Sequence, residues 1–197
     1  MAFTSNWYRA LYAVMSNDGV KPTSEDKKIY VTNYSGITNI LDYQNQGNSP
    51  YQALMLNSGA YNVTQGMAPT LTNVRGAVSD SSAGVIFGNG DAAPKPDDYC
   101  LSGDIITNLA AICTASRICT DEKVELTALY TITNNNNMAV TLSEVGLFAS
   151  IRVIESNGGA AKKAHLVERT VLDNPITIEP GGVGQVTYTI TMNYPTA

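Results

Sequence analysis

The chain has little charge and few of the side chains on which catalysis and metal binding usually depend. Only 15% of its 197 residues are charged, well below the roughly 25% of an average soluble domain. With a single histidine, a Ser-His-Asp or Cys-His catalytic arrangement would have to use His165, and a histidine-rich metal site is excluded. Because so few residues are charged, most of the polar surface must come from neutral Ser, Thr, Asn and Gln.

Neither a nucleic acid nor a membrane is expected as a partner. The 12 basic residues are scattered, the formal net charge is −5 and the pI is near 4.7, whereas binding to phosphate backbones depends on clustered Lys and Arg. No apolar run approaches the roughly 18 to 20 residues of a membrane-spanning helix. Residues 1–19 contain an arginine within their apolar part and lack a secretory pattern, so we expect synthesis and folding in the cytoplasm.

The cysteines and the acidic loop residues give no clear metal or cofactor motif. Cys100, Cys113 and Cys119 are odd in number and lack CxxC spacing, which favours reduced, partly buried thiols over disulfides or a zinc site. The acidic loop 89–98 lacks the spacing of an EF-hand, and acidic residues in turns usually cap backbone amides. We expect no cofactor and no metal, with an oxygen-ligand calcium site in this loop as the alternative.

Alternating apolar and polar residues predict β-strands, most clearly in the last third of the chain. Residues 124–133 alternate with period two, the four asparagines 134–137 make a turn, and a return strand begins at Val140. Residues 183–194 alternate in the same way. Less periodic strands are predicted at 29–32, 37–43, 52–56, 85–87, 148–154, 165–172 and 176–178. Short strands separated by turns predict a mainly β fold, an antiparallel β-sandwich of the Greek-key or jelly-roll type.

The chain divides into three predicted parts. Residues 1–19 form a short N-terminal helix, because apolar residues recur there at spacings of three and four. Residues 20–83 are β-rich with an uncertain fold, and residues 84–197 form the sandwich domain; one continuous domain with 20–83 is the alternative. Within the sandwich, the segment 98–119 fits either a helix or two irregular strands.

Aromatic residues of the helix and of the loops are candidates for subunit contacts. A tyrosine can pack its ring against a neighbour while its hydroxyl stays in water, although a helix packed on its own domain and ordinary half-buried tyrosines would show the same pattern. The candidate interface residues are Trp7, Tyr8, Leu11, Tyr12, Tyr43, Tyr51 and Tyr61.

One carboxylate stands out because it lies in an otherwise apolar strand. A buried Glu144 needs a partner, and Arg169 in a later strand is the candidate, so we predict a structural ion pair. The other glutamates, Glu168 among them, are interpreted as outer-face or loop residues. His165 has no cysteine or carboxylate at ligand spacing, which favours a structural or solvent-facing imidazole. We expect no catalytic residues and no enzymatic activity.

Four segments resemble sequence patterns of tailed-bacteriophage virion proteins. They are GVIFGNGDAAPKPDDYCLSGDII at 84–106, LSEVGLF at 142–148, LVERTVLDNPITIEPG at 166–181 and VTYTI at 186–190. The opening MAFTSNW also looks like the start of these proteins. The resemblance implies a structural protein of the virion, of the kind found among tail-fibre, baseplate, neck and head-decoration components, and it implies no catalytic residues.

We therefore expect a virion subunit that binds other virion proteins and forms a homo-oligomer or a symmetric array. A receptor- or carbohydrate-binding module is the alternative, with loop tyrosines stacking on a host-surface glycan, and an enzyme acting on cell-wall glycans is a third. The outer face of strand 183–194 is uncharged, whereas exposed edge strands usually carry charges or prolines. We predict that this strand is central in its sheet or covered by another subunit.

Overall fold

The structure, a computed structural model, describes residues 2–6, 8–9, 30–41 and 84–193. Within these ranges the chain is mainly β and all strand pairings are antiparallel, as predicted. The strands are β1 (Ala2–Phe3), β2 (Tyr30–Thr32), β3 (Thr38–Leu41), β4 (Gly84–Gly88), β5 (Leu109–Cys119), β6 (Lys123–Asn134), β7 (Val140–Ile154), β8 (Ala160–Ile178) and β9 (Val183–Asn193). No helix among the described residues has the length and apolar character to cross a membrane.

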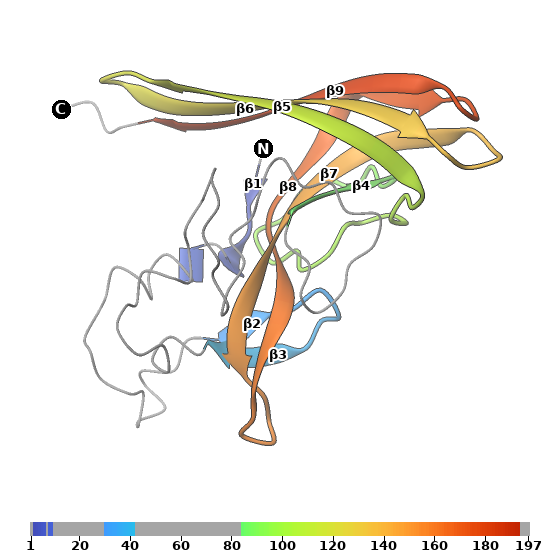
Figure 1. The fold of residues 1–197 in the computed structure, drawn as a ribbon. Helices are drawn as coiled ribbons and strands as arrows, with labels where there is room; N and C mark the ends of the chain where they lie inside the picture. Colours follow the sequence, from blue (N-terminus) through green and yellow to red (C-terminus); the bar gives the residue numbers. More distant parts are fainter. Residues whose placement is uncertain (1, 7, 10–29, 42–83, 194–197) are drawn as a thin grey trace.

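These strands form two sheets (Figure 1). A six-stranded sheet has the order β1-β8-β7-β3-β2, with β4 also paired to β7, and a three-stranded sheet has the order β5-β6-β9. Figure 1 shows the three-stranded sheet lying across one half of the long β7–β8 pair. The other half of that pair extends away from it and carries the β2–β3 hairpin through β3.

The core between the sheets follows the predicted alternation of β6 and β9. The inward-facing Ala128, Tyr130, Ile132, Val186, Tyr188 and Ile190 are buried, and the threonines between them are more exposed. Residues of both sheets share one cluster, which includes Val85, Phe87, Ala128, Tyr130, Ile132, Val145, Leu147, Val186, Tyr188 and Ile190. The rings of Phe87 and Tyr130 meet edge to face, with centroids 5.6 Å apart. Each such buried large side chain stabilises the fold by about 1.5–3 kcal/mol.

Strands β7 and β8 are continuous, whereas the sequence predicted each as two separate strands. The pairing shifts register between Leu142 and Glu144 and again between Leu147 and Phe148, and such bulges break the apolar alternation without ending the strand. In β8, residues 172–175 have no partner in β7. Pro175, which cannot donate a ladder hydrogen bond, lies in this unpaired stretch.

The N-terminus differs from the helix predicted over residues 1–19. Ala2–Phe3 forms β1, which pairs with Arg169 and Glu168 at the edge of β8, because the unpaired backbone groups of that edge accept a further strand. Helical conformation is described at positions 5, 6, 8 and 9, and the rest of the predicted helix lies outside the described residues.

The region predicted as 20–83 contributes β2 and β3, which confirm the strands predicted at 29–32 and 37–43. Because β3 pairs with β7, the predicted boundary at residue 83 falls between strands of one sheet. The predicted strand 52–56 lies outside the described residues. In the segment 98–119, which the sequence left open, Leu109–Cys119 is the single strand β5.

Candidate functional site

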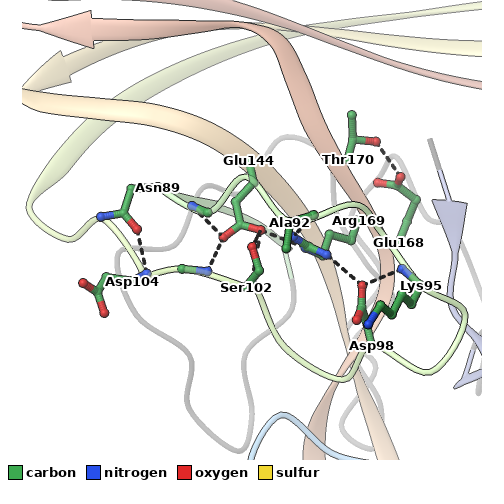
Figure 2. A network of polar contacts seen from close by, with 12 residues as sticks. Asn89, Ala92, Lys95, Asp98, Ser102, Asp104, Glu144, Glu168, Arg169 and Thr170 are labelled. Carbon is green, nitrogen blue, oxygen red and sulfur yellow. Dashed lines mark hydrogen bonds and ion pairs between the residues drawn. The ribbon is translucent and has the colours of Figure 1, made fainter.

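A buried polar network joins β7, β8 and the loop 89–104 (Figure 2). Nε of Arg169 donates to Oε2 of Glu144 at 2.8 Å, and both side chains are buried. The structure thus brings the predicted pair together on neighbouring strands. The other two nitrogens of Arg169 donate to Oδ2 of Asp98 at 2.8 Å and to the carbonyl oxygen of Ala92 at 2.7 Å. The guanidinium therefore also holds the loop to the sheet.

The Glu144 carboxylate accepts four further hydrogen bonds from the loop. Oε1 accepts from the backbone N of Gly90 at 3.0 Å and of Gly103 at 2.8 Å. Oε2 accepts from N and Oγ of Ser102 at 3.1 and 3.2 Å. Burial alone would raise the pKa of Glu144, but the Gly103 amide, the Arg169 guanidinium and the Ser102 amide together hold that pKa below its ordinary value. The carboxylate is charged at neutral pH and fully engaged in holding the loop.

Two glycines allow the loop to approach this carboxylate closely. A Cβ atom on Gly90 would overlap Oγ of Ser102 and Oε1 of Glu144, and one on Gly103 would overlap Oδ1 of Asn89. The Gly88-Asn89-Gly90 segment therefore packs against the carboxylate of Glu144. The segments 84–106, 142–148 and 166–181 all contribute to this one network.

Side chains of the acidic loop 89–98 accept hydrogen bonds from backbone groups of the protein. Oδ1 of Asn89 accepts from the backbone N of Asp104 at 2.7 Å, and Oδ2 of Asp98 accepts from the backbone N of Lys95 at 2.8 Å. The predicted capping of backbone amides is confirmed for Asn89 and Asp98. No group of three or more potential metal ligands occurs in the described part of the chain. The contact of Asp98 with Arg169 was missed, because no sequence spacing connects residues so far apart.

Glu168 was interpreted as an outer-face or loop residue, and this interpretation is wrong. Its side chain is fully buried, accepts from the hydroxyl of Tyr188 on β9, and accepts from Oγ1 of Thr170 at 2.7 Å. Successive residues of a strand point to opposite faces, and both faces of β8 are covered here. Arg169 points to the loop network, while Glu168 connects the six-stranded sheet to β9.

His165 is a buried structural residue, and the alternative of a solvent-facing imidazole is wrong. Its Nδ1 lies 2.8 Å from the carbonyl oxygen of Lys163, and its Nε2 has no hydrogen-bond partner among the residues described. Burial lowers the pKa of His165 to about 4, and the Lys163 contact only partly opposes this. An unfolded histidine has a pKa of about 6.5. Between about pH 4 and pH 6.5, His165 is therefore protonated in the unfolded chain but neutral in the folded chain.

The pH dependence of stability should therefore contain a contribution from His165. This contribution is complete above pH 6.5 and is lost as the pH falls towards 4. At pH 5 the free energy of unfolding should be lower by about 2 kcal/mol for this reason. Urea unfolding of the wild type and of His165→Phe at pH 8 and pH 5 measures it, because the carboxylates titrate alike in both proteins. Equal changes between the two pH values in both proteins would contradict this prediction.

The three-stranded sheet presents a largely uncharged surface on the side away from the core, which we call the neutral face. It is formed by Ile112, Thr114, Ser116, Ile118, Thr127, Leu129, Thr131, Thr133, Gln185, Thr187, Thr189 and Thr191, which lie on one side of the sheet by strand register. Ile112 is 75% exposed, Ile118 52% and Leu129 38%. Charge appears at one end only, where Nζ of Lys123 lies 2.8 Å from Oε2 of Glu125.

Among the strands that the structure describes, β9 lies at the edge of this sheet, so a central position, the first of its two predicted alternatives, does not hold there. The central strand is β6, which pairs with β5 on one side and with β9 on the other. Strands β6 and β9 have the same alternation, and a local pattern does not tell which of them has neighbours on two sides. The alternative prediction, that another subunit covers β9, stays a prediction.

Of the candidate interface residues, the structure describes only Tyr8. Tyr8 is 59% exposed, and its ring meets Phe3 edge to face at 6.5 Å. The others, Trp7, Leu11, Tyr12, Tyr43, Tyr51 and Tyr61, lie outside the described residues. The glycan-binding alternative, which depends on the loop tyrosines, therefore stays a prediction.

The three cysteines are free thiols, as predicted, but they differ in exposure. Cys100 and Cys113 are partly buried, and burial raises the pKa of both thiols. Cys119 is exposed, because it ends β5 beyond the part of the sheet that covers the core.

Comparison with known proteins gives no relative: no protein-family model, curated protein or solved structure matches the chain.

Proposed function

We propose that this chain is a non-enzymatic structural subunit of a tailed-phage particle, in which it makes assembly contacts with other virion proteins. The observation that carries the proposal is the neutral face. Isoleucine and leucine side chains are exposed there beside threonines, and such a surface can be buried against a neighbour without stranding ions. The particle is also where we propose that the protein is located.

The buried network supports a structural role for its charged residues, Glu144 and Arg169. Glu144 accepts five hydrogen bonds from Arg169 and the loop, and a general base needs a free lone pair within reach of a substrate proton. Three of the four phage-like segments contribute to this network, which supports interpreting the resemblance as one to structural proteins. The same proposal includes a sandwich of Greek-key or jelly-roll type, supported by the core that both sheets share.

A change on the neutral face should block assembly without unfolding the subunit. We expect the wild-type chain to be present in purified particles of the phage that encodes it. With Ile112→Lys and Leu129→Lys together, incorporation should fall at least about tenfold, because the lysines would be buried unpaired. Quantitative mass spectrometry of the particles measures this. Absence of the wild-type chain from the particles would overturn the proposed function.

Met138→Lys is the matched control. Met138 is 71% exposed and lies in the β6–β7 turn, outside the neutral face. Its replacement adds one lysine, where the double variant adds two, in place of an exposed apolar side chain, and incorporation should stay at the wild-type level. An equal loss with Met138→Lys would show that added charge anywhere on the chain prevents incorporation, and would count against the neutral face.

A further inference from the structure

The two sheets end in very different edge strands. The order of the six-stranded sheet ends in β1, with two residues, and in β2, with three, and β4, which is paired to β7 off this order, has five. Short edge strands are one of the means by which proteins prevent unwanted strand pairing. The three-stranded sheet instead ends in β5 and β9, each 11 residues long. In the described structure, each of these long edges is paired on one side only.

Of the two long edges, β9 is the better suited to pair with another strand. Its sequence VGQVTYTITMN contains no charged residue and no proline, whereas β5 contains Arg117. A long, uncharged strand with unpaired N–H and C=O groups is a template for a further strand. Because β9 has no charge, a second β9 can approach it without like-charge repulsion.

We propose that β9 pairs antiparallel with β9 of a second copy of this chain, so that the two three-stranded sheets join into one six-stranded sheet. This inference deepens the proposed function, on which it rests, by naming the partner of this edge. Full overlap of Val183–Asn193 with itself places the two-fold axis at Tyr188. Such an interface is isologous and closes as a dimer.

The register of this pairing is favourable on both faces of the joined sheet. Thr187 lies opposite Thr189 of the second copy, and Gln185 lies opposite its Thr191. Pairs of this kind already occur in the chain: the Oγ1 atoms of Thr127 and Thr189 are 3.4 Å apart across β6 and β9. On the inner face Val186 lies opposite Ile190 of the second copy, so the apolar layer continues from one subunit into the next.

Charge placed at the proposed axis tests the pairing directly. The double variant Thr187→Lys/Thr189→Lys brings four lysines together in the dimer, and self-association should weaken at least about hundredfold. Thr187→Glu/Thr189→Glu should have the same effect. An equimolar mixture of the two variants should recover the dimer, because each lysine then lies opposite a glutamate. Sedimentation velocity over a dilution series measures all three, with far-UV circular dichroism to verify folding.

The matched control is Thr114→Lys/Ser116→Lys, which adds the same charges on the neutral face but at the β5 edge, where both positions are exposed. It should self-associate like the wild type. A monomeric wild type would overturn the inference, as would a dimer that the β9 lysines leave intact. Either result leaves the proposed function open, because that function is tested by the presence of the chain in particles. If the lysine variant does not fold, the glutamate variant supplies the same comparison.

Discussion

Replacing Glu144 with glutamine is expected to lower the free energy of unfolding by about 3–5 kcal/mol. The carboxylate only accepts hydrogen bonds, and its two oxygens face the amides of Gly90, Gly103 and Ser102 and the guanidinium of Arg169. A glutamine has one acceptor oxygen and an NH₂ group, so either orientation places a donor against donors. The variant also removes the charge that partners a buried Arg169. Urea unfolding followed by circular dichroism at pH 7 measures the loss.

The pH dependence of this loss distinguishes the charge from the shape of the side chain. The pKa of Glu144 is lowered in the folded state, so its stabilisation is present above about pH 4.3, the pKa of an unfolded glutamate, and is lost as the pH falls through the folded value. The difference between wild type and Glu144→Gln should therefore shrink in acid.

Glu125→Gln is the control for this variant. Its ion pair with Lys123 is partly exposed, with side chains 23% and 41% exposed, and such pairs contribute about 0–1 kcal/mol. A loss below about 1 kcal/mol for Glu144→Gln, no larger than that of the control, would show that the network does not hold the loop to the sheet.

The second large effect is expected from Gly90→Ala, which should destabilise the protein by about 3 kcal/mol. The added Cβ would overlap Oε1 of Glu144, Oγ of Ser102 and the backbone N of Gly103. Most of these atoms belong to the backbone or to a fully buried side chain, so the loop itself must move away. Its movement would lengthen the hydrogen bonds that Glu144 accepts. Chemical denaturation measures this effect in the same way.

Gly159→Ala is the control for the added methyl group. Gly159 is exposed in the β7–β8 turn, and the nearest atom to its Cβ would be Oδ1 of Asn157, at 3.0 Å on a side chain that can move. We expect a change within about 1 kcal/mol. If Gly90 acts through the network, the double variant with Glu144→Gln should lose less than the sum of the single losses. Additive losses would assign the two residues separate roles.

Features that depend on residues close together in the chain were predictable without the fold. Strands β6 and β9 follow from their period of two. The β6–β7 turn follows from residues 134–137, where the Asn134 side chain donates to the carbonyl oxygens of Met138 and Ile178. The pairing of Glu144 with Arg169 was predictable because a carboxylate buried in an apolar strand needs a partner, and Arg169 lies in a later strand.

Which strand edges and faces are covered depends on the fold as a whole. It placed β9 at an edge, kept β7 and β8 continuous through their bulges, buried Glu168 against Tyr188 and brought Asp98 to Arg169. In each case the deciding partner is far away in the chain. Alternation tells that a strand has two different faces, but the number of its neighbours, and what covers its polar face, depend on contacts that no local pattern records.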